Sequence, residues 1–390
     1  MGRLDPYPRR RHCWGMVYDI AIIGAGIAGA SLAAELAPHM SVVLLEAEAH
    51  PGYHATGRSA AFWSVTYGGP LVEPLSTASG PFLAAPPRDF SETGFLKPRG
   101  ALMLGRAKDE AGIAAFLRAF DGSDVPLERW GAAEVRARLR GNHPLWDRGV
   151  WEPGTADIDV AALHQAYLRA ARRGGVAFLN HARVEQLSRG NGVWHVAWRE
   201  GDVRARRVVN AAGAWADAVA GLAGVPPAGV TPFRRTIVQL QVAADVPADL
   251  PLVVDINERF YFKPEGPDRI WLSPHDETPS PACDVAPEEL DIAEAIARFQ
   301  TVMDWPIARL ERSWAGLRSF APDRLPIFGE DPAAPGFFWC AGQGGFGIQT
   351  APAIAALLAA EILQEAPSGA YARLDPTAYG RGRARLVQKR

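Results

Sequence analysis

The stretch DIAIIGAGIAGASLAAEL, residues 19–36, carries the pattern that decides the fold. Four apolar residues lead into the motif Gly24-x-Gly26-x-x-Gly29, and an Ala- and Leu-rich helical pattern follows it. Strand, glycine turn and helix in this order form the phosphate-binding part of a βαβ unit. The first glycine makes the turn, the second lets a pyrophosphate approach the backbone, and the third lets the helix pack on the strand. We therefore predict a Rossmann-like dinucleotide site at this turn.

The next stretch, SVVLLEAE at residues 41–48, reads as the second strand of the unit and ends near Glu46 and Ala47. An acid at the end of this strand accepts hydrogen bonds from both ribose hydroxyls and repels a 2′-phosphate. Glu46 therefore argues against NADP.

Length and composition are those of an ordinary globular protein. The 390 residues suit two domains, and 48% of them are hydrophobic and 22% charged. A formal net charge of −2 argues against a general nucleic-acid or membrane-surface role. No apolar run reaches the roughly 18 residues that a transmembrane helix needs.

The cysteines and the chain start give weaker indications. Cys13, Cys283 and Cys340 are far apart and form no CxxC pair, so we expect no disulfide framework, no metal site and a cytoplasmic location. Residues 1–15 are basic and lack a secretory h-region, so we expect a disordered extension. Translation could instead start at Met16, and the sequence does not decide between these alternatives.

Two further strand-to-helix turns are rich in glycine or alanine. One is NAAGAW at residues 210–215, and the other is GQGGFG at residues 342–347. A nicotinamide site needs only the first turn of the chain, whereas a larger, permanently held cofactor with an isoalloxazine ring explains all three.

These motifs resemble a known family. TGRSAA at residues 56–61, NAAGAW and GGFGIQT at residues 344–350 are similar to the FAD-dependent D-amino-acid oxidase and dehydrogenase superfamily, most of all to its D-arginine dehydrogenases. The resemblance runs from about Tyr18 to the last helix. In this likeness the helix from about Thr350 directs its N-terminal dipole at the flavin edge that gains charge on reduction. The attachment cysteine of the sarcosine-oxidase branch is missing near GLRSF, so we expect non-covalent FAD.

The resemblance implies that FAD is held by residues of all three turns and of the loop after the second strand. They are Gly24, Gly26, Ile27, Ala28, Gly29, Glu46, Ala47, Thr56, Arg58, Ser59, Ala60, Val184, Ala212, Gly213, Trp215, Gly344, Gly345, Gly347, Ile348, Gln349 and Thr350.

The predicted fold class is α/β (α+β), with a Rossmann-like FAD-binding domain interleaved with a substrate domain. Four strand candidates at residues 234–242, 250–256, 259–264 and 269–274 follow one another, which favours a mainly antiparallel sheet in the substrate domain. The predicted FAD-binding segments are residues 16–88, 151–230 and 314–382, the substrate segments are 89–150 and 231–313, and 383–390 form a tail.

An amino-acid substrate brings a carboxylate, which an arginine fork binds through both oxygens. In the resembled family, Arg318 in GLRSF and Arg235 in PFRRT match the positions that grip it, and Tyr261 and Tyr67 match positions that line the same pocket. Most of the other arginines, Arg234 included, are expected at the surface.

Two departures from the D-arginine enzymes bear on the substrate. Ala101 takes the place of the glutamate that faces the guanidinium, and Phe62 takes the place of a histidine, while Leu252 and Val254 keep another wall apolar. A buried cationic side chain would lack a partner, which is costly. We therefore expect D-amino acids with apolar or aromatic side chains, oxidised to 2-oxo acids by hydride transfer to the flavin.

Two alternatives remain open. An oxidase of N-methyl or other secondary amines shares the fold, but Trp271 falls about where that branch has the lysine that activates oxygen. This difference favours a dehydrogenase that passes electrons to a quinone or another acceptor over an oxidase that uses O2. A flavin-binding redox sensor without turnover belongs to another class, and the retained arginines speak against it. His54 is a weak candidate for a general base because it lies in the flavin loop.

Overall fold

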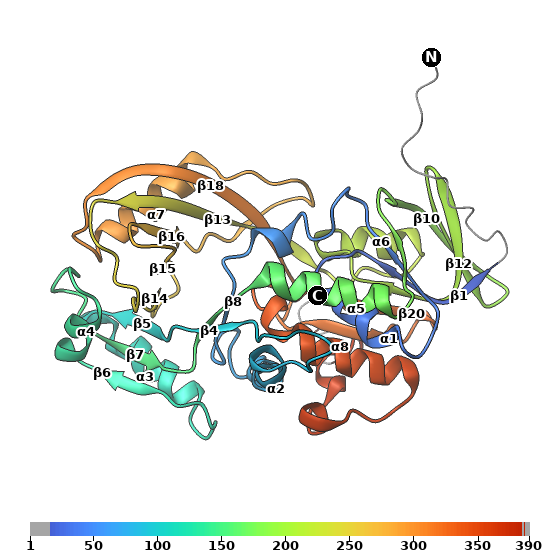
Figure 1. Cartoon of the computed structure of the whole chain (residues 1–390), viewed down its shortest axis with the longest axis horizontal. Coiled ribbons are helices and arrows are strands. Elements are labelled where there is room, and N and C mark those ends of the chain that lie inside the picture. Colours follow the sequence, from blue (N-terminus) through green and yellow to red (C-terminus); the bar gives the residue numbers. More distant parts are fainter. Residues whose placement is uncertain (1–15, 384–385, 387–390) are drawn as a thin grey trace, which may run out of the picture.

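The computed structural model describes residues 16–383 and 386, so the expected extension at residues 1–15 and most of the expected tail lie outside the described residues. The chain forms two lobes that lie side by side (Figure 1). One lobe is built on an eight-stranded sheet, the other on a nine-stranded sheet, and a three-stranded sheet accompanies them. The predicted fold class is confirmed.

The eight-stranded sheet contains the predicted dinucleotide unit. Its main strand order is β10 (Val184–Gly190), β11 (Val193–Trp198), β12 (Gly201–Asn210), β1 (Val17–Ile23), β2 (Val42–Leu45) and β9 (Ala177–Leu179). β20 (Phe337–Ala341) also pairs with β12, and β19 (Ile327–Glu330) pairs with β20. β1 is parallel to both β2 and β12, so the carboxyl ends of these three strands meet at one edge of the sheet.

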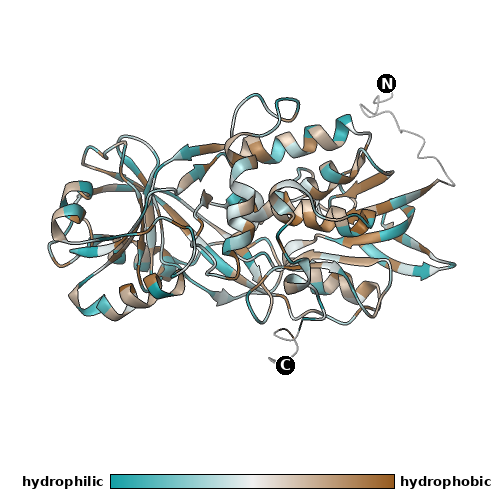
Figure 2. Ribbon diagram, turned by 90° about the horizontal axis from the view of Figure 1, so that it is seen from below, coloured by the Kyte–Doolittle hydropathy of each residue, from teal (hydrophilic) through white to brown (hydrophobic). Residues whose placement is uncertain are grey.

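Helices cover this sheet and bury its apolar strands. They are α1 (Ile27–Leu36), α2 (Glu73–Ala84), α5 (Val160–Arg173), α6 (Ala216–Leu222) and α8 (Gly347–Leu363). α1 packs against both α5 and α8, and hydrophobic strands run through this lobe in Figure 2. Asp159 accepts a hydrogen bond from the Ala162 N–H at 2.8 Å and so caps the start of α5.

The nine-stranded sheet carries the predicted substrate strands. Its order is β17 (Thr278–Pro279), β13 (Thr231–Val242), β16 (Arg269–Ser273), β15 (Tyr261–Pro264), β14 (Leu252–Asp255), β5 (Ala101–Gly105), β7 (Arg148–Glu152) and β6 (Glu128–Trp130). The long strand β18 (Ile307–Phe320) pairs with the other edge of β13 and crosses the predicted boundary at residue 314. Pairing is antiparallel except between β14 and β5, which are parallel. Helices α3 (Glu110–Ala119), α4 (Ala132–Arg138) and α7 (Glu289–Gln300) belong to this lobe.

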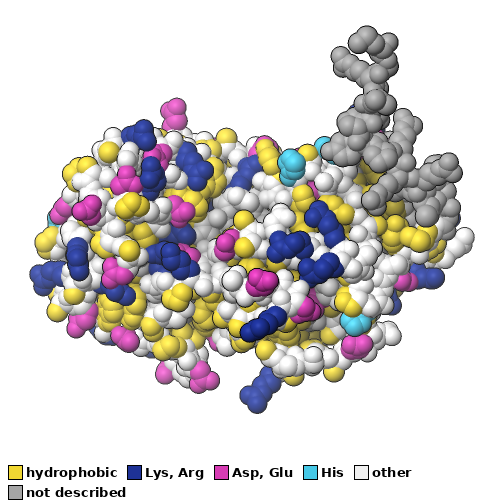
Figure 3. Space-filling model, in the orientation of Figure 1, with side chains coloured by type: hydrophobic (Ala, Val, Ile, Leu, Met, Phe, Trp, Pro, Cys, Tyr) yellow, Lys and Arg dark blue, Asp and Glu magenta, His cyan; other side chains and the backbone are white. Residues whose placement is uncertain are grey.

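The small sheet consists of β3 (Phe62–Trp63), β8 (Ala156–Ile158) and β4 (Leu96–Pro98). It fixes the loop after β2, which carries several predicted site residues. On the substrate lobe in Figure 3, acidic and basic side chains are interspersed. Within residues 16–383, no helix is both long and apolar enough to cross a membrane.

Candidate functional site

A cavity of about 430 Å³ opens where the three predicted turns meet. It begins at the glycine turn after β1 and extends to the arginines of β13 and β18. Most of the predicted cofactor residues line it. They are Gly24, Gly26, Ile27, Ala28, Glu46, Ala47, Thr56, Arg58, Ser59, Ala60, Val184, Ala212, Gly213, Trp215, Gly344, Gly345, Gly347 and Ile348.

The first turn has the close backbone packing that its glycines predict. Gly24 has φ +103°, and a Cβ there would lie 2.5 Å from the Ala211 carbonyl oxygen. A Cβ on Gly29 would lie 1.9 Å from the Gly24 oxygen, so Gly29 brings α1 against the strand rather than lining the cavity. The Glu46 carboxylate accepts hydrogen bonds from the N–H groups of Ala25 at 2.9 Å and Glu48 at 3.0 Å. Its remaining lone pairs are available to ribose hydroxyls.

The last glycine turn lies against the arginines. α8 begins at Gly347 and not near Thr350, because Phe346 already accepts the Thr350 N–H at 3.1 Å. Thr350 is buried and also bonds the Phe346 carbonyl through its hydroxyl. A Cβ on Gly345 would come within 2.3 Å of the Tyr67 hydroxyl and 2.9 Å of Arg318 Nη1, so only glycine leaves this space open.

Gln349 holds the loop that carries Tyr67. Its side chain accepts the Ser64 N–H at 3.0 Å and donates to the Ser76 hydroxyl at 2.7 Å. The buried Glu152 also holds this loop and accepts hydrogen bonds from Ser64 Oγ and the Val65 N–H. No sequence motif marked Glu152, because its partners lie more than eighty positions away in the chain.

Arg235 and Arg318 lie together at the inner end of the cavity. They come from the paired strands β13 and β18, in which Arg235 is opposite Gly316 and Arg318 is opposite Phe233. Because side chains alternate along a strand, the two arginines are diagonal neighbours on one face of the sheet. Arg318 Nη1 donates to the Tyr67 hydroxyl at 2.6 Å.

The two guanidinium groups form a site for an anion. Arg235 is 4% exposed, and its burial and the charge of Arg318 lower its pKa to about 10. Arg235 Nη1 is buried and has no partner among the described residues. A buried donor without a partner is rare in folded proteins, so this nitrogen is a candidate contact for a ligand oxygen.

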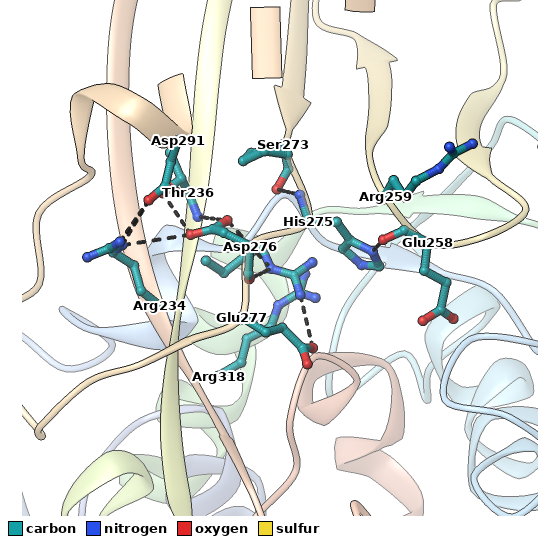
Figure 4. Close-up of polar contacts among 12 residues, drawn as sticks. Arg234, Thr236, Glu258, Arg259, Ser273, His275, Asp276, Glu277, Asp291 and Arg318 are labelled. Carbon is teal, nitrogen blue, oxygen red and sulfur yellow. Dashed lines mark hydrogen bonds and ion pairs between the residues drawn. The ribbon is translucent and has the colours of Figure 1, made fainter. Parts of the chain in front are cut away.

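Arg234, expected at the surface, is buried instead. It contacts Asp291 at 2.9 Å and also pairs with Glu288. Neighbouring residues of a strand point to opposite faces, but the Asp276 carboxylate is near both arginines, 3.8 Å from Arg234 Nε and 3.9 Å from Arg235 Nε. The close-up in Figure 4 shows Arg234 with Asp291 and Thr236, on the other side of Asp276 from Arg318.

An aromatic cluster lies beside the arginine pair. The Phe62 ring is 5.1 Å from the Tyr67 ring and 6.2 Å from the Tyr261 ring, measured between centroids. The free space among Phe62, Tyr261, Arg318 and the Gly345 turn is only about 10 Å³, which is room for about one water. The predicted pocket residues Ala101 and Leu252 lie with Tyr261 in one buried apolar cluster, and Phe62 and Val254 pack against that cluster. Ala101, Leu252 and Val254 are not among the residues that line the cavity.

One histidine and one cysteine also line the cavity, and a second cysteine lies in the core. His54 lines it, but its Nε2 contacts the Glu48 carboxylate at 3.1 Å, and its ring lies 4.6 Å from that of Trp215. Cys283 lies in a loop that lines the cavity from the substrate lobe. Cys340 is buried in β20, as expected for a core residue, and burial raises the pKa of its thiol to about 12.

A glycine-lined dinucleotide cavity that ends at an anion site defines a flavoprotein oxidoreductase. Residues 19–361 match the family described as DAO, FAD dependent oxidoreductase, and the chain belongs to this family. FAD is its cofactor. The space left open by Gly24, Gly26 and Gly345 and the acid at Glu46 fit this cofactor.

Several relatives act on small amino acids according to their names. Dimethylglycine dehydrogenase of Rattus norvegicus is 29% identical over 254 residues, covering 60% of this chain and 29% of that protein. This chain therefore spans less than a third of that relative. Glycine oxidase of Geobacillus kaustophilus (strain HTA426) is 27% identical over 362 residues, covering 89% of this chain and 93% of that protein.

Solved structures show the same fold. A crystal structure of glycine oxidase from Geobacillus kaustophilus has a TM-score of 0.81 at 22% identity, covering 94% of this chain and 98% of that one. L-proline dehydrogenase from P. horikoshii also has a TM-score of 0.81, at 21% identity, covering 94% of this chain and 97% of that one. The predicted family is confirmed, and the narrower likeness to D-arginine dehydrogenases stays a prediction.

Proposed function

We propose that the protein oxidises the C–H bond next to the nitrogen of a small α-amino acid, such as glycine or its N-methyl derivative sarcosine. The carboxylate is held by Arg235 and Arg318. The observation that carries this proposal is the buried, unpartnered Arg235 Nη1 beside a second arginine, at the end of the FAD cavity. Arg235 is buried and its guanidinium is close enough to that of Arg318 for the two charges to repel each other, so an anion that binds both groups is favoured.

The small size of the substrate follows from the aromatic cluster. Phe62, Tyr67 and Tyr261 fill the region where a long side chain would extend, and the small cavity lined by Phe62, Tyr261 and Arg318 measures about 10 Å³. A hydrogen or a methyl group needs little room there, whereas a leucine or phenylalanine side chain requires Phe62 to move. The names of the glycine oxidase and dimethylglycine dehydrogenase relatives support the same choice.

The chain acts mainly by holding and orienting its substrate. FAD, when bound, accepts the hydride that leaves the substrate carbon. Arg318 and Arg235 fix the carboxylate, and Tyr67 is itself fixed by Arg318, so the reacting carbon is confined to one position. The substrate nitrogen gives up a proton as its C–N bond becomes an imine. Water then hydrolyses the imine to an oxo compound and an amine or ammonium ion.

A second candidate is the D-amino-acid activity expected from the sequence, with apolar side chains. It is favoured by the apolar cluster of Ala101, Met103, Leu252 and Ile237, against which Val254 packs, directly behind Phe62 and Tyr261. If Phe62 moves on substrate binding, this cluster provides the wall of a larger pocket.

Anaerobic titration of the purified holoenzyme tests both candidates. Glycine, sarcosine, D-leucine, D-phenylalanine and D-arginine are compared by the rate at which each bleaches the flavin absorbance, with product analysis for ammonium, methylamine and formaldehyde. We expect glycine or sarcosine to give the largest second-order rate constant. A clear preference for D-leucine or D-phenylalanine would establish the second candidate, and absence of bleaching by every amino acid would contradict the proposal.

A further inference from the structure

Two carboxylates approach Arg235 in this structure: that of Asp276 is 3.9 Å from Nε, and that of Glu277 is nearer. Arg235 Nη2 lies 3.1 Å from Glu277 Oε1, and Arg235 Nε donates to the backbone carbonyl of Asp276 at 2.8 Å. Both partners belong to the loop between β16 and β17, and Figure 4 shows them side by side with Arg318. Two of the three guanidinium nitrogens are therefore held by one loop, and Nη1 is left for the ligand.

Arg324 holds Glu277 from the other side. Its Nη2 donates to both Glu277 oxygens, at 2.7 Å and 3.0 Å. The Arg324 guanidinium lies over the Phe320 ring at 3.9 Å. Phe320 in turn packs so closely on the last glycine turn that a Cβ on Gly344 would lie 2.1 Å from its ring. Glu277 is thus joined to the turn that lines the FAD cavity.

We propose that Glu277 and Arg324 are positioning residues for the substrate carboxylate. This inference rests on the proposed function, in which Arg235 is one of the two carboxylate ligands. The contacts immobilise a long side chain before substrate arrives, so its conformational freedom is not lost on binding. The negative charge of Glu277, together with that of Asp276, also offsets the repulsion between the guanidinium groups of Arg235 and Arg318.

Glu277 also has a competing electrostatic effect, and the two effects predict opposite changes in carboxylate binding. Glu277 carries the same charge as the substrate carboxylate, and if repulsion dominated, its neutralisation would tighten carboxylate binding. Positioning predicts the reverse. Glu277→Gln keeps the size of the side chain but loses the paired interaction with Arg324, so the orientation of Arg235 becomes less restricted.

The experiment measures the Kd of acetate for the holoenzyme through the change in flavin absorbance. KM and kcat for the best amino acid, FAD content and melting temperature are measured in parallel. We expect Glu277→Gln to raise the acetate Kd and the KM about tenfold with kcat changed less than twofold. Arg324→Gln should act in the same direction with a smaller, about threefold, effect. Because both residues act through one chain of contacts, the double variant should be no worse than Glu277→Gln alone.

Glu288→Gln is the matched control, because Glu288 pairs with Arg234, the neighbour of Arg235 on β13. It should leave the acetate Kd within twofold of the parent. An unchanged or lower Kd in Glu277→Gln, or an equal loss in Glu288→Gln, overturns the inference. Arg318→Ala distinguishes failure of the proposed function from failure of the positioning role. If Arg318→Ala binds acetate as well as the parent, the proposed function is wrong. If Arg318→Ala loses acetate binding and Glu277→Gln does not, only the positioning role is wrong.

Discussion

The two arginines should not contribute equally, and lysine substitutions reveal the difference. Arg235 gives Nε to Asp276 and Nη2 to Glu277, so one nitrogen remains for the substrate. Among the described residues, Arg318 donates a hydrogen bond from Nη1 to Tyr67. Its other guanidinium N–H groups can therefore bind both oxygens of a carboxylate. Lysine replaces a single donor but not a planar fork. We expect Arg318→Lys to cost about 2–4 kcal/mol of transition-state stabilisation and Arg235→Lys about 1.5 kcal/mol, the lower end of the range for one hydrogen bond to a charged group.

These values correspond to a fall in kcat/KM of roughly 30- to 1,000-fold for Arg318→Lys and about tenfold for Arg235→Lys. The assay is stopped-flow flavin reduction by the best amino acid, with FAD content checked by absorbance. Arg312→Lys serves as the control, since Arg312 is an exposed residue of the same strand β18. Equal losses, or a larger loss in Arg235→Lys, would refute the assignment of the fork to Arg318.

Three other predictions follow from the structure. Heat or acid precipitation should release the FAD into a yellow supernatant, and flavin that stays with the pellet would show a covalent bond. Phe62→Ala should raise the ratio of kcat/KM for D-leucine over sarcosine at least tenfold by opening the space beside Tyr261, and an unchanged ratio would show that Phe62 does not limit size. Burial lowers the pKa of His164, whose Nε2 contacts the Ala25 carbonyl at 2.9 Å, so below about pH 6.5 the unfolded chain binds a proton that the folded chain does not. The free energy of unfolding should then decrease by up to about 1.4 kcal/mol for each pH unit by which the pH is lowered. Thermal unfolding at pH 7.5 and 5.5 should show a smaller dependence on pH in His164→Gln than in the parent protein. An equal dependence in both proteins would contradict the assignment.

Local patterns predicted the nucleotide-binding half well. Gly24 and Gly29 are fixed by contacts within one βαβ unit, so the sequence contains the whole reason for them. The cap at Asp159 and the turn before α8 are local in the same sense. The start of α8 was placed about three residues late, because the glycines that open the turn also supply the first residue of the helix.

The substrate half depends on long-range pairing that no local pattern reveals. Arg235 and Arg318 are more than eighty positions apart in the sequence and meet because β13 pairs with β18. Only the family resemblance pointed to them. Arg234 and Arg235 point to opposite faces of β13, and the sequence alone does not show which face meets the cavity. Glu277 lies in a loop without a motif, so its contact with Arg235 could not be foreseen. Phe62 was expected to line a pocket, and its position between Tyr67 and Tyr261 shows that it also fills one.

The claim that the arginine pair recognises the substrate carboxylate is tested most directly by removing that carboxylate. Anaerobic flavin reduction is compared for the best amino acid and for its amide, in the parent protein and in Arg318→Ala. We predict that the parent prefers the acid by at least a hundredfold in the second-order rate constant, and that Arg318→Ala loses most of this preference by slowing the acid and not the amide. Equal rates for acid and amide in the parent protein, or a full preference that survives in Arg318→Ala, would contradict the account.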